Sequence, residues 1–185
     1  MAKLQVTPII GLPQFNGWSQ VTTNSHRSLI CSLAVFGQNA GNIGRDMVAA
    51  IEQAKPTSAA DFHSFLQNLI DEVIEAGGRP ALACLLTVNN HSILAAYQGS
   101  ILLKRTGKVG IILSSQDTLK VVEGSYVPDD TLILATAQGA SYLGEIQQKI
   151  SQGYDMDTII TSLVPSRRRR LNVPLVFFQD ISLCS

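Results

Sequence analysis

The sequence predicts an α+β fold, a four-layer α-β-β-α sandwich in which two antiparallel β-sheets lie between two layers of helices. One observation is a helical repeat of apolar residues over 62–74, and another is a series of short apolar or alternating runs over 81–136. The third is the order of elements: a hairpin, two helices, several strands, two more helices and a last strand. This order favours antiparallel sheets covered by helices over alternating parallel β-α units.

The first predicted element is an early β-hairpin. Its polar turn lies at residues 24–25, and its second strand runs to Phe36. Residues 37–44 are rich in glycine and are predicted to form a loop. A helix is expected over residues 45–54, where apolar residues recur at helical spacing.

The second helix carries the clearest local signals in the sequence. Ser58 is its predicted N-cap, and Gly77, Gly78 and Pro80 are expected to end it. The apolar residues of its buried face follow the three-and-four spacing of a helix: Phe62, Phe65, Leu66, Leu69, Ile70, Val73 and Ile74.

The middle of the chain is predicted to be a series of strands. Turn residues separate four apolar or alternating runs, at 81–88, 92–97, 101–105 and 109–113. Because the breaks are short and contain asparagine or glycine, these runs predict an antiparallel meander. Another strand is expected over 131–136.

The C-terminal part is predicted to contain two helices and a strand. A first helix begins near Gly139, and a second begins at Asp155 or Asp157 and ends at Pro165. An apolar run over 173–178 predicts the last strand.

The composition predicts a single domain over residues 1–185. The chain has a mass of 19.9 kDa and is 45% hydrophobic, which is enough for a substantial core. Its 14 basic residues balance 14 acidic ones, so no net charge attracts nucleic acid or an anionic membrane. The basic run at 167–170 is interpreted as a solvated loop. With no secretory signal and no apolar run near the roughly 18 residues of a membrane span, we expect a cytoplasmic protein.

The cysteine and histidine residues do not form a recognisable site. Cys31 and Cys84 fall within apolar, strand-like runs and are expected to be buried thiols. His26 and His91 fall in predicted turns, and His63 lies on the polar side of a predicted helix. None of the histidines has an evident acid or nucleophile beside it, so surface positions are expected.

Four parts of the sequence carry short motifs in register with the predicted elements. Residues 33–41 read Leu-Ala-Val-Phe-Gly-Gln-Asn-Ala-Gly. Residues 78–83 read Gly-Arg-Pro-Ala-Leu-Ala and are followed at 95–101 by Ala-Ala-Tyr-Gln-Gly-Ser-Ile. Residues 129–138 read Asp-Asp-Thr-Leu-Ile-Leu-Ala-Thr-Ala-Gln, and residues 171–178 read Leu-Asn-Val-Pro-Leu-Val-Phe-Phe.

In this order, the four parts resemble the motifs of the PPM-type (type 2C, metal-dependent) serine/threonine protein phosphatases, over residues 21–178. The corresponding family motifs are Phe-Ala-Val-Phe-Asp-Gly-His-Gly-Gly, Gly-Ser-Thr-Ala with Ala-Asn-Val-Gly-Asp-Ser-Arg, Gly-Asp-x-Leu-Leu-Leu-Ala-Thr-Asp-Gly, and Asp-Asn-x-Thr-x-x-Val-Val. The resemblance implies the same sandwich fold.

The resemblance also shows which positions differ from the family. The family's metal-ligand positions are occupied by Gly37, Gln38, Ala137 and Leu171. Family-like residues are retained at Gly41, Ser100, Thr136 and Asn172. Family members use two Mn²⁺ or Mg²⁺ ions to activate water, and such cations need oxygen ligands. We therefore predict no metal site, no catalytic residue and no cofactor in this chain.

These observations predict a catalytically inactive, phosphatase-like module that binds a protein partner or regulates one. An alternative is a divergent phosphatase or other phosphoester hydrolase that uses Asp129, Asp130 or Asp180, although the first two are better explained as turn residues. Another alternative is a scaffold or sensor domain of a longer polypeptide, whose partner would be the remainder of that chain. The oligomeric state stays open.

Overall fold

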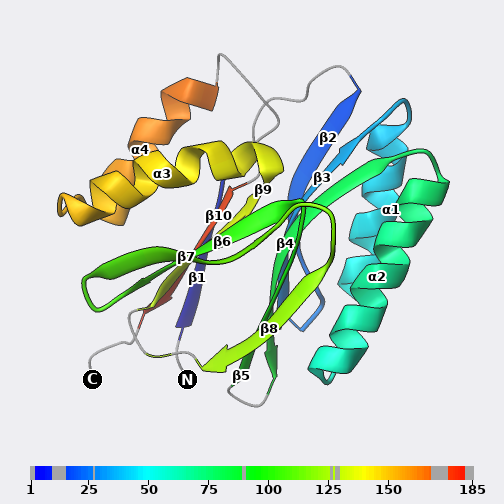
Figure 1. Cartoon of the computed structure of the whole chain (residues 1–185), viewed down its shortest axis with the longest axis horizontal. Helices are drawn as coiled ribbons and strands as arrows, with labels where there is room; N and C mark the ends of the chain where they lie inside the picture. The colour runs from blue at the N-terminus through cyan, green and yellow to red at the C-terminus, as the bar shows by residue number, and fades with distance from the viewer. Residues whose placement is uncertain are drawn as a thin grey trace.

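A computed structural model describes residues 3–9, 16–26, 28–88, 91–125, 127, 130–167 and 175–181. For residues 3–6, 9, 164–167 and 175–181 it describes the backbone alone. In the described part, two five-stranded antiparallel sheets lie between two pairs of helices, so the predicted four-layer sandwich is confirmed (Figure 1).

The first sheet has the strand order β1-β10-β9-β6-β7. Its bounds are β1 (Lys3–Ile9), β10 (Leu175–Ile181), β9 (Thr131–Thr136), β6 (Gly99–Arg105) and β7 (Lys108–Ser115). The outer face of this sheet is covered by α3 (Ala137–Ser151) and α4 (Met156–Arg167) (Figure 1).

The second sheet has the strand order β2-β3-β4-β5-β8. Its bounds are β2 (Gly17–Thr23), β3 (Leu29–Phe36), β4 (Arg79–Val88), β5 (His91–Tyr97) and β8 (Lys120–Ser125). Two helices pack on its outer face, α1 (Ala40–Gln53) and α2 (Ala59–Glu75) (Figure 1).

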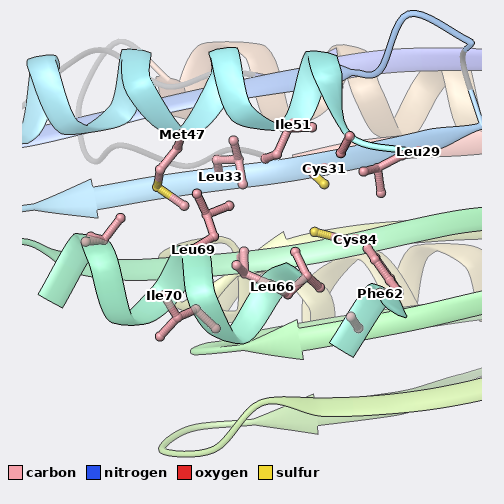
Figure 2. Close-up of a cluster of buried hydrophobic side chains, with 14 of the residues drawn as sticks. Leu29, Cys31, Leu33, Met47, Ile51, Phe62, Leu66, Leu69, Ile70 and Cys84 are labelled. Atoms are coloured by element: carbon pink, nitrogen blue, oxygen red, sulfur yellow. The ribbon is translucent and has the colours of Figure 1, made fainter. Parts of the chain in front are cut away.

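The core has three layers because alternate residues of each strand point to opposite faces of its sheet. On β3, for example, Cys31 and Leu33 face α1 and α2, whereas Ile30 faces the other sheet. Figure 2 shows the layer beneath α1 and α2, where Met47 and Phe62 pack over β3 and β4. Central strands such as β3 and β9 are therefore buried on both faces, which explains their nearly continuous apolar sequences.

Several predicted elements agree with the structure. The early hairpin, the helix after Ser58, the strand at Thr131–Thr136 and the final strand are all present. Ser58 caps α2 as predicted, since its Oγ accepts a hydrogen bond from the backbone N–H of Asp61 at 3.1 Å.

The prediction of a glycine-rich loop over residues 37–44 was wrong in its second half, because α1 begins at Ala40. Gly44 is buried in this helix, and a Cβ placed there would overlap the ring of Trp18 on β2. The glycine therefore allows a helix and a strand to approach closely and does not mark a loop.

The predicted meander was also wrong, because the strands that follow one another in sequence do not stay in one sheet. β4 and β5 belong to the second sheet, whereas β6 and β7 belong to the first. The chain crosses between the sheets at Gln98, which has a φ of 50°. β8 was not predicted as a separate strand, and it returns to pair with β5.

Two helix boundaries differ from the prediction as well. α3 begins at Ala137, two residues before Gly139, directly after β9. α4 continues through Pro165 to Arg167. A proline removes its own N–H from the helix but has a helical φ, so one near the end of a helix need not stop it.

Candidate functional site

The register of the strands brings the ends of β3 and β9 to the same end of the sandwich. β5 leads through Gln98 directly into β6, so β5 ends where β6 begins. Because neighbouring strands are antiparallel, β3 and β9 end there too, and β4 and β8 begin there. We call this the site end, since it holds Gly37 after β3 and Ala137 after β9.

Gly99 shows how closely the two sheets approach near the site end. A Cβ at this position would lie 2.6 Å from the carbonyl oxygen of Leu82 on β4 and 2.9 Å from that of Ala135 on β9. Glycine is therefore needed here because the backbones of the two sheets leave no room for a side chain.

Gly37 occupies a backbone conformation that an aspartate rarely adopts. Its φ is +141°, and an added Cβ would lie 2.9 Å from the carbonyl oxygen of Gly77. The backbone of Gly37 is held on both sides, since its N–H donates to Asn16 O at 2.9 Å and its carbonyl accepts from Ala40 N at 3.2 Å. A carboxylate at this position would require a different local backbone.

Gln38 and Gly41 lie on either side of the start of α1. Gln38 is exposed, whereas Gly41 is half-buried in the first turn of the helix, and a Cβ added to it would have no neighbouring atom within 4 Å. Gly41 therefore belongs to the helix and not to a loop around a ligand. Nothing in its surroundings requires a glycine at this position.

Thr136 and Ala137 form the junction between β9 and α3. The Thr136 side chain is fully buried, and its Oγ1 has no hydrogen-bond partner among the described residues. Ala137 is exposed, and Gln138 is half-buried with its Oε1 enclosed and likewise unpartnered. Thr136 lies opposite Gly99 in the sheet, so its side chain is on the face toward the second sheet.

Ser100 lies on the other face of the same sheet. Its Oγ is 2.9 Å from Ser114 Oγ on β7. It pairs with Ala135, which belongs to the core layer under α3 and α4. Ser100 therefore joins β6 to β7, on the opposite face from Thr136.

Leu171 and Asn172 lie outside the described residues, as does Asp129. β10 begins at Leu175, which pairs with Ala135. The structure therefore places Gly37, Gln38 and Ala137, and their correspondence to the family's metal-ligand positions stays a prediction, as does that of Leu171.

The carboxylates considered for a divergent hydrolase lie away from the site end. Asp130 precedes β9, at the opposite end of that strand from Ala137, and it is paired with Arg105. The backbone of Asp180 lies in β10 one residue beyond Gln179, which pairs with Thr131, so it too is far from Ala137 along the strand. The turn role predicted for Asp130 is confirmed by its acceptance of a hydrogen bond from Val127 N at 3.1 Å.

The side chains of Gly37, Gln38 and Ala137 do not fit a pair of divalent cations. Gly37 offers no side chain, Ala137 offers a methyl group, and the neutral amide of Gln38 is exposed. Mg²⁺ and Mn²⁺ require several oxygen ligands and are stabilised by carboxylate charge. Within the described part of the chain, no three His, Cys, Asp or Glu side chains are grouped closely enough to hold a metal ion.

The histidine positions agree with the sequence analysis. His26, His63 and His91 are all exposed. Cys31 and Cys84 are both fully buried and lie opposite each other on β3 and β4 (Figure 2). These side chains therefore lie outside the site end, in agreement with their predicted surface and core positions.

Comparisons with solved structures identify the fold. The chain superposes on a serine/threonine phosphatase of S. agalactiae with a TM-score of 0.68 and 9% identity, over 98% of this chain and 100% of that one. For the Mycobacterium tuberculosis phosphatase PstP/Ppp the TM-score is 0.69 at 12% identity, over 98% and 99%. For the PstP catalytic domain in complex with 2 manganese ions it is 0.68 at 11% identity, over 98% and 99%.

These structures establish that the chain has the PPM phosphatase fold along nearly its whole length. No protein-family model matches the sequence, and no curated protein matches it. No helix among the described residues has both the length and the apolar character needed to cross a membrane.

Two features of the site end were missed by sequence reasoning. The sequence identifies Thr136 as a family-like residue but does not show that its hydroxyl is buried without a partner among the described residues. This burial depends on the approach of the second sheet. Arg79 follows the helix-ending glycines and is exposed at the start of β4, where it pairs with Phe36 just before Gly37. Its position beside Gly37 could not be seen without the β3–β4 pairing.

Proposed function

We propose that this chain is a catalytically inactive domain with the PPM phosphatase fold, and that it acts as a binding or regulatory module. The observation that carries the proposal is the conformation of Gly37. At this position the chain has a positive φ and no space for a Cβ, so it lacks both the carboxylate and the backbone that could present one.

The electrostatics of the site end support the same proposal. Hydrolysis through two metal ions needs negative charge to hold the ions near the attacking water and the phosphate. Ala137 stands at the first position of α3, where the helix dipole is positive and repels cations. Because Gly37, Gln38 and Ala137 supply no carboxylate to outweigh this dipole, these three positions disfavour a divalent cation.

The partner of the module is proposed to be a protein or another part of a longer polypeptide, in the cytoplasm. The chain carries no net charge, which argues against recognition of nucleic acid through its phosphate backbone.

The second candidate function is a divergent phosphoester hydrolase. It is favoured by one observation, namely that the solved structures with this fold include serine/threonine phosphatases that this chain matches over 99–100% of their length. Such an enzyme would need groups other than Gly37 and Ala137 for catalysis. The carboxylate of Asp130 already forms an ion pair with Arg105.

The two candidates are separated by metal titration and turnover on the same protein. The chain is stripped of metal with a chelator, titrated with Mn²⁺ and Mg²⁺ by calorimetry, and then assayed on p-nitrophenyl phosphate and on a phosphoserine peptide. We expect no saturable binding and no metal-stimulated hydrolysis. Mn²⁺-dependent turnover that co-purifies with the protein and is lost on unfolding would establish the hydrolase instead.

A further inference from the structure

Cys31 and Cys84 lie directly opposite each other on two neighbouring central strands. In the antiparallel register of β3 and β4 the two residues are partners, and both are fully buried. Because opposite residues of neighbouring strands point to the same face of a sheet, both side chains belong to the layer beneath α1 and α2 (Figure 2). The two thiols therefore face the same layer as a cross-strand pair.

The hydrogen bonds between the two strands determine the type of this pair. The N–H of Thr87 donates to the carbonyl oxygen of Ser28 at 2.7 Å, so these two residues form a hydrogen-bonded pair just before the start of β3. Hydrogen-bonded and non-hydrogen-bonded pairs alternate along antiparallel strands. The register continues without a shift to Cys31 and Cys84, three steps further along, which therefore form a non-hydrogen-bonded pair.

Pro80 gives an independent check of this assignment. It lies opposite Val35 in the same register, and a proline has no N–H to donate to the neighbouring strand. Such a residue fits a non-hydrogen-bonded pair, in which no N–H bonds across to the partner. Cys84 lies four residues further along β4, and an even number of steps returns to the same type of pair. Both ends of the β3–β4 ladder therefore give the same assignment.

The separation of residues in such a pair matches the span of a disulfide bond. The Cα atoms of a non-hydrogen-bonded pair are about 4.5 Å apart, and disulfides join Cα atoms that are roughly 4.4–6.8 Å apart. The Cβ atoms are about 4.5 Å apart in the pair and about 3.8 Å apart in a disulfide, so they need to approach by about 1 Å or less. The bond therefore requires a small movement of the strands, and the resulting strain makes it easier to reduce.

We propose that Cys31 and Cys84 form a reversible disulfide across β3 and β4 and are a redox modification site of this domain. The inference goes beyond the proposed function and does not depend on it, because the pair lies in the core and not at the site end.

The oxidant is proposed to be a peroxide, which is small enough to enter a briefly opened core. The thiolate of one cysteine attacks an oxygen of hydrogen peroxide, breaks the O–O bond and becomes a sulfenic acid, while hydroxide leaves. The second thiolate attacks the sulfenic sulfur, forms the S–S bond and releases the second hydroxide. The two thiol protons and the two hydroxides make two water molecules, and the two sulfurs lose the two electrons that reduce the peroxide.

Burial controls how fast this reaction runs. It raises the pKa of the Cys31 thiol well above its ordinary value, with the Cys84 thiol adding to the shift. Since the thiolate is the nucleophile, the closed core keeps the pair unreactive. Oxidation therefore proceeds during transient opening of the layer beneath α1 and α2, and the pair responds to sustained oxidising conditions.

The first measurement tests whether the folded domain accepts the bond. The third cysteine is replaced (Cys184→Ser), and the chain is unfolded in urea, oxidised with peroxide and refolded. The disulfide closes a loop of about 50 residues and constrains the unfolded chain, so we expect a Tm about 5 °C above that of the reduced chain, lost again on adding dithiothreitol. An oxidised chain that fails to refold, or that melts no higher than the reduced chain, would overturn the proposal.

The second measurement tests whether the folded chain is itself oxidised. Folded protein is exposed to peroxide and then denatured, and its free thiols are alkylated with N-ethylmaleimide and counted by mass spectrometry. We expect the loss of both thiols and one peptide pair linked through Cys31 and Cys84, with both changes reversed by dithiothreitol. Thiols that stay free after an exposure that oxidises the urea-unfolded chain would show a packing pair only, which contradicts the proposal.

Two single variants are the controls. Cys31→Ala and Cys84→Ala each keep one thiol of the pair, so neither should form the internal disulfide or gain stability on oxidation. A gain of stability in either would assign the effect to another oxidised side chain and defeat the proposal. If a variant does not fold, the linked peptide of the parent chain decides alone. Metal-stimulated turnover in the assay above would defeat the proposed function without affecting these thiols, so the two failures are distinguishable.

Discussion

The guanidinium of Arg105 holds the carboxylate of Asp130 at the end of the first sheet that lies away from Gly37. Arg105 Nε donates to Asp130 Oδ1 at 2.8 Å, and Nη2 lies 2.5 Å from Oδ2. Asp130 is 2% exposed and also accepts from Val127 N, while Arg105 additionally donates to Ser125 O at 2.9 Å. Arg105, at the end of β6, therefore links the residue before β9 through an ion pair and the last residue of β8 through a hydrogen bond.

Loss of one partner of this pair should be strongly destabilising. Arg105→Met leaves the buried Asp130 carboxylate without its countercharge, and we expect a loss of about 3 kcal/mol in the free energy of unfolding. The double variant Arg105→Met, Asp130→Asn should recover part of this loss, because the unpaired charge is gone. Urea unfolding measures both, and equal losses in the single and double variants would show that the pair contributes packing alone.

Alanine substitutions at two helical glycines, Gly44 and Gly144, should have opposite effects on stability. Gly44→Ala should destabilise the protein by about 1–3 kcal/mol, because the new Cβ overlaps the indole ring. Gly144→Ala, on the exposed side of α3 with nothing within 4 Å of the new Cβ, should stabilise by up to about 1 kcal/mol through helix propensity. Thermal unfolding of the two variants checks both signs, and a stable Gly44→Ala protein would mean that Trp18 moves freely.

The N-cap of α2 can be tested with a control on the same helix. Ser58→Ala removes the acceptor of the Asp61 N–H and should cost about 1 kcal/mol. Ser64→Ala, at an exposed position within α2, should be neutral or slightly stabilising. The difference between the two in urea unfolding reports the cap; similar values for both would indicate that the hydrogen bond contributes nothing net.

The stability of the domain should fall at alkaline pH because of Cys31. Burial raises the pKa of the Cys31 thiol well above its ordinary value of 9.0, with the neighbouring Cys84 thiol adding to the shift. The unfolded chain then loses this proton at a lower pH than the folded chain does. Stability is therefore fully present below pH 9 and declines as the pH rises beyond it, by up to about 1.4 kcal/mol per pH unit.

The measurement is urea unfolding at about pH 8 and about pH 10 in reducing buffer, on either side of the ordinary thiol pKa, with Cys31→Ala as the control. The variant has a lower stability throughout because of its smaller side chain, but its decline between the two pH values should be smaller. An equal decline in both proteins would assign the effect to other groups.

The fold was predictable wherever local signals decide the structure. The limits of α2 follow from a serine cap and a pair of glycines, both of which act on their own backbone neighbours. Local signals do not decide to which sheet a strand belongs. β5 and β6, for example, have similar apolar sequences and a connection of one residue. Their separation into two sheets depends on pairing with β4, β8 and β9, which lie elsewhere in the chain.

The candidate site likewise has features that the sequence shows and features that only the structure shows. The absence of carboxylates at Gly37, Gln38 and Ala137 is a property of the sequence, and its resemblance to a phosphatase family located those positions along the chain. Sequence alone could not show that Gly37 has a positive φ against Gly77, because that conformation depends on the β3–β4 pairing and on the end of α2.

The sequence by itself determined the order of most elements, without β1 and β8, the apolar faces of the helices and central strands, and the absence of carboxylates at Gly37, Gln38 and Ala137. The tertiary structure decided where the chain changes sheets, why Gly44 and Gly99 must lack side chains, and that Thr136 is buried beside an uncapped helix with no partner among the described residues. The physical reason is range: periodicity and capping act over a few residues, whereas close approach and burial depend on segments brought together only by folding.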